Sequence, residues 1–278
     1  MPEVAIIIVN TNTRDWLHQC LLSLRDNDDV EREVVVIEND SEDSSREMLQ
    51  EEFPEVKVIV NEEKFGFAYN NNLGAKASTA PVLLFLNPDT KVPPGSLRHM
   101  LNAIEHRPDM GVFGGKIFDG KDGIERSTGK FPTLTSIFLD RILGYAPPLH
   151  PLLQRFSQRH YSGYETARSV DWVTGADLWI RRQLFESVGG WDSAIFLYYE
   201  DQDLCYKVKR AGYGVFYTPT STIYHYHNQT PMTSDYRKGL MRKGLHIFIR
   251  KHYGPVRCWL YKKVLRLPDI DPGEAEKK

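Results

Sequence analysis

Few cysteines occur in this chain, and none lies close to another in the sequence. The three, Cys20, Cys205 and Cys258, form no CxxC pair, which excludes the zinc-finger and zinc-ribbon classes. An odd, scattered set is typical of reduced thiols in a cytosolic protein. Because Cys20 and Cys205 lie among apolar neighbours, we expect both to fill the hydrophobic core.

Long apolar runs are missing as well. No segment approaches the roughly 20 apolar residues that span a bilayer. The N-terminus MPEVAIIIVN also lacks the basic stretch that opens a signal peptide. We therefore expect a cytoplasmic protein that is either free or peripheral at the inner face of the plasma membrane.

The chain also lacks a large net charge. The chain has 35 Lys and Arg against 37 Asp and Glu, a formal net charge of −2, so charge gives no case for a nucleic-acid partner. The GxSxG motif of hydrolases, the HExxH motif of metalloproteases and the GK[ST] ending of a Walker loop are missing too. Residues 269–278 are polar, and we expect them to form a disordered tail.

The first half of the chain alternates apolar runs with helical patterns. Strands are predicted at residues 4–9, 34–37, 56–60 and 82–86. Helices are predicted at residues 14–24, 68–78 and 95–107, and Ser44 with Glu47 predicts a capping box that opens another helix. The strands show no polar alternation, which is typical of a parallel sheet covered by helices on both faces. Right-handed crossovers then predict a doubly wound α/β unit.

The second half is less regular. Residues 169–182 and 214–228 resemble strands on either side of a helix at 198–212. The proline-containing stretch 131–156 has an apolar character that would suit a lid over an acceptor or a contact with lipid.

Polar segments follow each predicted strand of the first half. They comprise residues 10–12, 38–43, 61–72 and 87–90. In sheets of this kind, ligands bind beyond the carboxyl ends of the strands. Asp89 is therefore expected at a ligand-binding edge, although Asn-Pro-Asp is also an ordinary turn sequence.

Two other motifs suggest chemistry, and each has a structural alternative. YYEDQDL places Glu200, Asp201 and Asp203 at the start of a helix, where they either complement the helix dipole or supply a general base. YHYHN places His225 on an extended strand, as either a surface residue or a metal ligand beside Asp89. Such a mixed oxygen and imidazole set tolerates Mn²⁺ at least as well as Mg²⁺.

Seven segments in chain order resemble an inverting family-2 glycosyltransferase with a GT-A fold, close to its bacterial rhamnosyltransferase-like branch. They are VNTN, ENDSED, GFAYNNNLGAK, FLNPDT, VTGADLWIRR, GGWDSAIFLYYEDQDLCYKVKRAGY and HYHNQT. The resemblance runs from about Val4 to Thr230. It implies a mostly parallel central sheet flanked by helices. It also implies a catalytic domain over residues 1–235, with a nucleotide-binding half of about 1–118 and an acceptor half of about 119–235.

The resemblance implies roles for the residues that match the family motifs. The implied nucleotide-binding set is Asn10, Asn12, Glu38, Asn39, Gly66, Phe67, Asn70, Asn71 and Asn87. Glu38 stands where the family usually has Asp, so the base preference stays open. The implied donor-sugar and acceptor loop contains Gly175, Ala176, Asp177 and Trp191.

The catalytic roles follow in the same way. Asp89 is implied as a metal ligand, with His225 in place of the missing first carboxylate of a DxD motif. Asp201 is the implied base, and Glu200 and Asp203 are its supports.

The implied activity is transfer of rhamnose or another hexose from a dTDP- or UDP-linked donor, with inversion and with Mn²⁺ or Mg²⁺. The implied acceptor is a glycan or a polyprenyl-linked glycolipid. One alternative, a sugar-phosphate nucleotidyltransferase, needs a Gly-rich basic loop after the first strand, where this chain has NTNTRDW. The other, a catalytically silent nucleotide-sugar-binding protein, would have lost Asp89 or Asp201.

Residues 236–268 form a basic amphipathic segment. No Asp or Glu occurs from Arg237 to Arg266. This pattern fits either an anionic membrane surface or a helix packed on the domain with a solvated basic face.

Overall fold

The computed structural model describes residues 1–121, 123–133, 135–136, 163–226 and 233–265. The tail at 269–278 and residues 137–156 of the proline-containing stretch lie outside the described residues. So do residues 227–230 of the HYHNQT segment.

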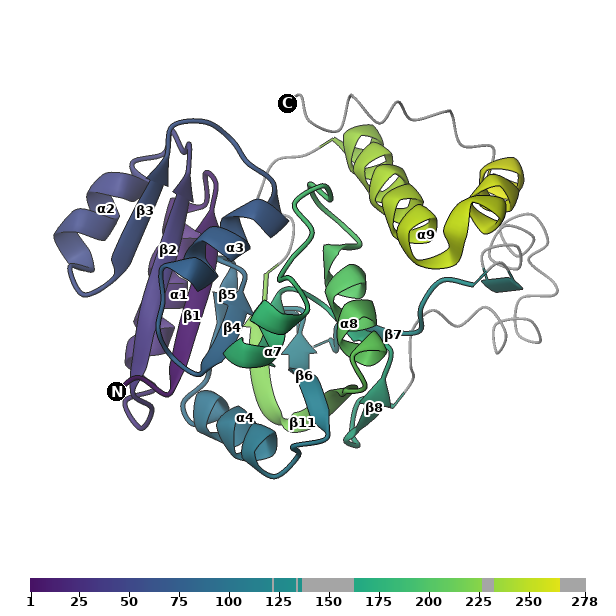
Figure 1. Ribbon diagram of the computed structural model, residues 1–278. Coiled ribbons are helices and arrows are strands. Elements are labelled where there is room, and N and C mark those ends of the chain that lie inside the picture. The colour runs from purple at the N-terminus through teal and green to yellow at the C-terminus, as the bar shows by residue number, and fades with distance from the viewer. Residues whose placement is uncertain (122, 134, 137–162, 227–232, 266–278) are drawn as a thin grey trace.

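One sheet forms the centre of the molecule (Figure 1). Its strand order is β3-β2-β1-β4-β10-β6-β11-β5, and β8 pairs with β11 as its ninth strand. The strands are β1 (Val4–Asn10), β2 (Arg32–Asn39), β3 (Lys57–Asn61), β4 (Val82–Leu86), β5 (Thr90–Lys91), β6 (Met110–Phe118), β8 (Arg168–Val170), β10 (Asp177–Arg181) and β11 (Gly214–His225). β7 (Thr128–Gly129) and β9 (Trp172–Val173) form a separate pair. The four predicted strands of the first half are confirmed, and all are parallel to their neighbours among themselves.

Strands from the second half of the chain bring distant residues to one edge of this sheet. β10 runs antiparallel to β4 and pairs Asp177 with Leu86, so the loop before β10 lies beside the carboxyl end of β4. β11 pairs His225 with Thr90 of β5. Residues 87–89, 174–176 and the end of β11 therefore meet where the parallel strands end.

Helices cover both faces, as the continuous apolar strands predicted. The helices are α1 (Arg14–Arg25), α2 (Ser45–Glu52), α3 (Phe67–Lys76), α4 (Ser96–Glu105), α7 (Arg182–Ser187), α8 (Glu200–Arg210) and α9 (Ser234–Leu265). Alternate residues of β1 enter two different cores: Ile6 packs with residues of α1, α2 and α4, and Ile7 packs with residues of α3, α7 and α8. Cys20 and Cys205 are fully buried, one in each core, which confirms their predicted role.

The predicted capping box is wrong. Ser44 precedes α2 but has φ 59, and its side chain makes no capping hydrogen bond. The carboxylate of Asp43 accepts a hydrogen bond from the backbone N–H of Ser45 instead, at 3.2 Å. Left-handed geometry at Ser44 turns its hydroxyl away from the helix, so its neighbour takes the role.

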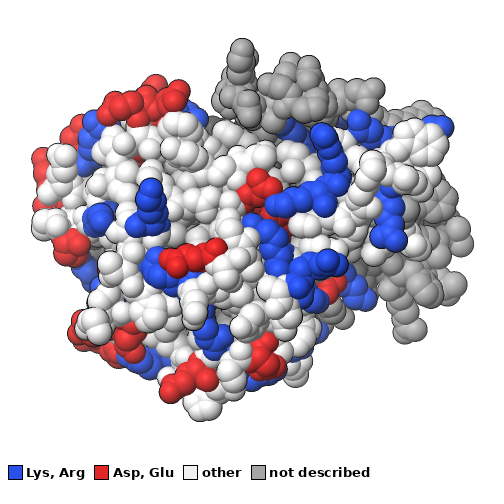
Figure 2. All heavy atoms as spheres, viewed as in Figure 1, with Lys and Arg blue, Asp and Glu red and all other residues white. Residues whose placement is uncertain are grey.

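The basic segment forms α9, which lies beside α8 at the far end of the sheet from β3 (Figure 1). α9 bends at Gly254, which has φ 82 and precedes Pro255. No helix in the described part of the chain is both long and apolar enough to cross a membrane. In Figure 2 acidic side chains gather over α2 and β3, whereas basic side chains gather over α8 and α9.

Candidate active site

A cavity of about 860 Å³ opens at the carboxyl edge of the sheet. Ten of the predicted site residues line it: Asn12, Asn39, Phe67, Asn87, Asp89, Gly175, Ala176, Glu200, Asp201 and His225. These residues come from the ends of β2 and β11, the loops after β1 and β4, the start of α3, the loop before β10 and the first turn of α8. Asp89 and Asp201, which are 112 positions apart in the chain, thus face the same enclosed space.

Asp89 and His225 form a pair at the floor of this cavity. The Nε2 atom of His225 lies 3.2 Å from a carboxylate oxygen of Asp89, and its Nδ1 atom lies 3.0 Å from Glu125. Burial alone would lower the pKa of His225, but its hydrogen bonds to Asp89 and Glu125 raise it to about 9. The ring therefore carries a proton at neutral pH and neutralises part of this acidic pocket.

Asp89 and His225 are also the two side chains that were predicted to hold a divalent cation. No cluster of three or more His, Cys, Asp or Glu side chains arranged to hold a metal occurs among the described residues. Asp89 offers carboxylate oxygens and His225 an imidazole nitrogen, and both border the cavity. This donor pair fits a hard cation such as Mg²⁺ or Mn²⁺.

Glu200 and Asp201 begin α8 and have different electrostatic surroundings. Burial, and then the charge of Asp201, raise the pKa of Glu200 well above its ordinary value. Burial also raises the pKa of Asp201, to about 6, although backbone N–H groups of Gln202 and Gly175 oppose the shift. With a pKa of about 6, Asp201 is mainly an ionised carboxylate at neutral pH, which is the state that a general base needs.

The turn before these carboxylates is strained. Tyr198 and Tyr199 both have left-handed backbone angles, with φ 68 and φ 73. Bulky residues rarely adopt this geometry, which costs about 1–3 kcal/mol each. Asn12, which lines the opposite side of the cavity, has φ 52. Strain of this kind persists where the surrounding structure fixes a functional position.

Asp203 does not face the cavity. It is fully buried on the other side of α8, where it contacts His252 at 2.6 Å and Lys251 at 2.9 Å. Lys207 lies 3.5 Å away. Burial alone would raise the pKa of Asp203, but hydrogen bonds from His252 and Lys251 hold it below the ordinary value. Asp203 therefore contacts α9 and does not line the cavity, and its predicted support for Asp201 stays a prediction.

Several residues of the predicted nucleotide-binding set form a buried network behind the cavity. Asn10 donates to Glu38 at 2.6 Å, and burial raises the pKa of Glu38. Asn61 donates to Asn39 and to Asn70, at 3.1 and 2.7 Å. Of these five, only Asn39 lines the cavity. The other amides hold the strand ends together, so their structural role is clear and any contact with nucleotide stays a prediction.

Two further residues of that set fix the start of α3. The side chain of Asn71 donates to the carbonyl of Phe67 at 2.9 Å and is buried. Gly66 lies against the segment that leads to α8, because a Cβ there would lie 2.8 Å from the Cα and carbonyl oxygen of Phe196. The backbone N–H of Phe67 donates to the carbonyl of Phe196 at 2.9 Å. The glycine thus lets the start of α3 pack against the segment that leads to Asp201.

The predicted donor-sugar loop is only partly at the cavity. Gly175 and Ala176 line it, and the carbonyl of Ala176 accepts a hydrogen bond from the N–H of Asn87 at 3.2 Å. Asp177 begins β10 and is buried in the sheet, where it accepts hydrogen bonds from Gly115 and Trp179. Burial raises the pKa of Asp177 to about 6.

Trp191 lies beneath the cavity wall. It is 2% exposed and packs against Phe67 and Phe85, with ring centroids 5.7 and 4.9 Å away. Its contribution is therefore to support Phe67, which does line the cavity.

Other lining residues were not predicted. Glu125 follows β6 in an irregular segment, and nothing in its sequence spacing connects it with Asp89. Arg237 and Met241 reach the cavity from α9. The basic pattern of α9 was visible in the sequence, but only the packing of α9 against α8 brings its first turns to the cavity.

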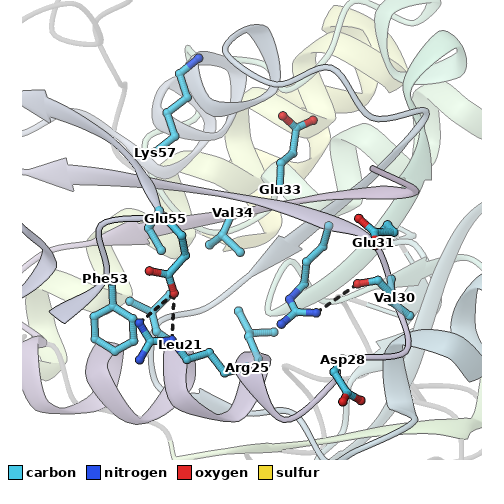
Figure 3. A pocket seen from close by; sticks show the side chains of 13 residues that line it. Leu21, Arg25, Asp28, Val30, Glu31, Glu33, Val34, Phe53, Glu55 and Lys57 are labelled. Atoms are coloured by element: carbon cyan, nitrogen blue, oxygen red, sulfur yellow. Dashed lines mark hydrogen bonds and ion pairs between the residues drawn. The ribbon is translucent and has the colours of Figure 1, made fainter. Parts of the chain in front are cut away.

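A second cavity of about 480 Å³ lies between α1 and the beginnings of β2 and β3 (Figure 3). Its charged groups have local partners: Arg25 pairs with Glu55 at 2.8 Å, and Arg32 donates to the carbonyl of Val30 at 3.1 Å. This cavity lies at the amino ends of the parallel strands, away from the edge where the fold gathers Asp89 and Asp201.

Comparisons with known proteins support the family that the sequence motifs predicted. A model described as Glycosyl transferase family 2 matches residues 5–167. The chain is 28% identical over 204 residues to an N-acetylglucosaminyl-diphospho-decaprenol L-rhamnosyltransferase of Mycobacterium tuberculosis, covering 69% of this chain and 66% of that protein. It therefore spans slightly less than two thirds of that relative's length. It is 26% identical over 234 residues to the rhamnosyltransferase WbbL of Escherichia coli, covering 80% of this chain and 83% of that protein.

A solved structure extends the likeness to the fold. The crystal structure of GalNAc-T7 with UDP, GalNAc and Mn²⁺ covers 100% of this chain and 53% of that protein, with 17% identity and a TM-score of 0.64. The central sheet and flanking helices are those of the GT-A fold. With the family model matched over more than half of its residues, the chain belongs to glycosyl transferase family 2.

Proposed function

We propose that this protein transfers rhamnose or another hexose from a dTDP- or UDP-linked donor to a hydroxyl group of a glycan or polyprenyl-linked glycolipid, with inversion. The observation that carries the proposal is that Asp89 and Asp201 line one cavity. Both relatives are named rhamnosyltransferases, which supports the sugar, and the name of the Mycobacterium tuberculosis relative supports a polyprenyl-linked acceptor.

Asp201 acts as the base. Its carboxylate is ionised at neutral pH and removes the proton of the acceptor hydroxyl as that oxygen attacks the anomeric carbon. Asn39 and Phe67 line the nucleotide side of the cavity, and exposed Lys64 and Arg126 at its border offer positive charge to the diphosphate.

Asp89 with His225 would hold Mn²⁺ or Mg²⁺, and His225 would bind it as a neutral imidazole after losing to solvent the proton that it carries in the free chain. A bound cation supplies Lewis-acid stabilisation of the diphosphate leaving group.

The carboxylates of the cavity favour a single displacement. Retention of configuration by a double displacement needs a second ionised carboxylate that acts as nucleophile. The pKa of Glu200 is raised well above its ordinary value, Asp203 faces away, and Asp89 and Glu125 are engaged with His225. Asp201 is thus the carboxylate of the α8 motif that best combines ionisation at neutral pH with access to the cavity.

Transfer assays on three variants test the proposal. Asp201→Asn should still bind nucleoside diphosphate in a thermal-shift assay with Mn²⁺, yet lose nearly all transfer. Asp89→Ala should lose the metal-dependent part of nucleotide binding. Asp109→Asn is the matched control, because Asp109 is an exposed carboxylate paired with Arg107 away from the cavity. Transfer by Asp201→Asn at the wild-type rate would remove the base from the mechanism.

We also propose that α9 contacts an anionic membrane surface. Beyond the bend, Val256, Trp259 and Leu260 are 71%, 54% and 37% exposed, and their spacing places them on one stripe of the helix. Cys258 and Tyr261 on the opposite side are buried against the domain. This exposed apolar stripe on a basic helix suits the interface of an anionic bilayer, where Trp and Leu enter the headgroup boundary.

Sedimentation with vesicles tests this contact. The wild-type chain should sediment with vesicles that contain anionic lipid and stay in solution with neutral vesicles, and Trp259→Ser should weaken the binding. A wild-type chain that stays in solution with both kinds of vesicle would favour a solvated basic face, and equal binding of the two proteins to anionic vesicles would rule out Trp259 as part of the contact.

A further inference from the structure

Helix α9 forms part of the wall of the active-site cavity. Tyr236, Arg237 and Met241 in its first turns line the cavity together with Tyr198 and Asp201. The helix therefore contributes to the site as well as to the surface, and the way it is held on the domain matters for the site.

The backbone of α9 at Gly244 lies against the strained turn before the base. A Cβ atom at Gly244 would overlap the carbonyl oxygen of Tyr198 and would also lie 3.4 Å from the Cβ of Tyr199. Gly244 is buried. The backbone of α9 thus lies directly on the two residues whose left-handed angles aim α8 into the cavity.

Apolar packing joins the same two elements. Tyr199, Leu245 and Phe248 belong to one buried cluster, and the rings of Tyr199 and Phe248 lie 6.3 Å apart. Tyr198 packs against the edge of this cluster.

A buried ionic cluster fixes α9 along the helix axis. Asp203 contacts both Lys251 and His252, and Lys251 also contacts Asp192 at 2.5 Å. Asp203 lies two residues after Asp201 in the same helical turn. The carboxylate that anchors α9 and the carboxylate that faces the acceptor are therefore held by one rigid element.

We infer that α9 positions the catalytic base: Gly244 seats the helix on the Tyr198–Tyr199 turn, Asp203 fixes it there, and together they hold Asp201 in the cleft. Gly244 and Asp203 are positioning residues, since neither lines the cavity. The inference rests on the proposed function for Asp201, but it makes a separate structural claim about residues 196–202.

A pair of glycine substitutions in one helix tests the inference. Alanine favours a helix over glycine at both Gly244 and Gly239. At Gly239 nothing lies within 4 Å of the added Cβ, whereas at Gly244 the Cβ would displace the turn. Gly244→Ala should lower kcat by about 10- to 100-fold, the range that a misplaced catalytic group costs, and leave the donor KM within about threefold. Gly239→Ala should leave both unchanged.

Hydrogen exchange gives a readout that does not depend on activity. Amides of residues 196–202 should exchange faster in Gly244→Ala than in Gly239→Ala, while those of β1 stay protected. Equal kcat and equal exchange in the two variants would overturn the inference. A wild-type chain that transfers no sugar would overturn the proposed function, and the exchange comparison would still decide whether α9 holds the turn.

The ionic anchor provides a second pair of variants. Asp203→Asn and Lys251→Met should show the same fall in kcat and the same faster exchange at residues 196–202. Lys209→Met is their control, because it removes an ion pair with Asp171 at the opposite end of α8. If Gly244→Ala does not fold, these variants decide, and wild-type kcat in both anchor variants contradicts the inference.

Discussion

The ionisation of Asp201 leads to a quantitative prediction for the pH dependence of transfer. The perturbation is a fall in pH, which protonates the carboxylate and removes the base. Burial raises the pKa of Asp201 to about 6. Because the group must be deprotonated to act, kcat/KM for the acceptor should rise with pH through this value and level off above it.

The magnitude follows from a single ionisation. With a pKa of about 6, about 10% of the activity should remain at pH 5 and about 90% should be present at pH 7. An ordinary Asp would instead place the midpoint near pH 3.9, with almost no change between pH 5 and pH 7. A roughly ninefold difference between these two pH values therefore separates a buried base from an exposed carboxylate.

Glu200→Gln is the control that isolates Asp201. Burial, and not the charge of Glu200, raises the pKa of Asp201, so a neutral amide of the same shape at position 200 should leave the midpoint within about half a unit. Asp201→Asn should lower kcat/KM by about 100- to 10,000-fold at pH 7 and abolish the rise of kcat/KM with pH. Initial rates would be measured from pH 4.5 to 8 at a fixed free Mn²⁺ concentration.

Two results would refute the reasoning. A wild-type midpoint near pH 4 would show that the carboxylate is not desolvated in the working enzyme. A loss of activity in Glu200→Gln as large as that in Asp201→Asn would show that the base has been assigned to the wrong residue.

Three further predictions concern the metal side and the frame of the cavity. Asp89→Ala should lower transfer by at least about 100-fold, and EDTA should cause no further loss in that variant, because both changes remove the same Lewis acid. Gly66→Ala should lower the free energy of unfolding by about 1–3 kcal/mol in a urea titration, because its Cβ would lie 2.8 Å from the backbone of Phe196. Gly239→Ala, which meets open space, should not lower it. Ile7→Ala should lower it by about 2–5 kcal/mol, because Ile7 is fully buried in β1 and its loss leaves a cavity.

Much of the fold could be predicted from apolar patterning. The runs at 4–9 and 82–86 contain no polar residue, and a strand that is buried on both faces needs this composition. Strand β6 was missed because MGVFGGKIF contains three glycines and reads as a loop. Its glycines are required by packing: a Cβ at Gly114 would lie 2.8 Å from Val173. Contacts of that kind cannot be read from local pattern.

The sequence predicted the lining residues whose positions follow from the order of the strands. It missed those whose positions depend on how helices and loops pack. Asp89 and Asn39 follow parallel strands, so their meeting at one edge was a consequence of the fold class. Arg237 and Glu125 come from a helix and a loop that no strand rule places. The pairing of His225 with Asp89 depends on the antiparallel register of β11 with β5, which the sequence does not specify.

The different outcomes for Asp201 and Asp203 have a geometric cause. Successive helical residues are about 100° apart, so residues i and i+2 point about 200° apart and cannot face the same space. A carboxylate motif that lies on a helix therefore serves two partners: Asp201 faces the acceptor, and Asp203 faces whatever packs behind α8. Here that partner is α9, through Lys251 and His252. A motif with two acidic residues need not contain two catalytic groups. In this protein the second acidic residue, Asp203, connects the helix that carries Asp201 to α9.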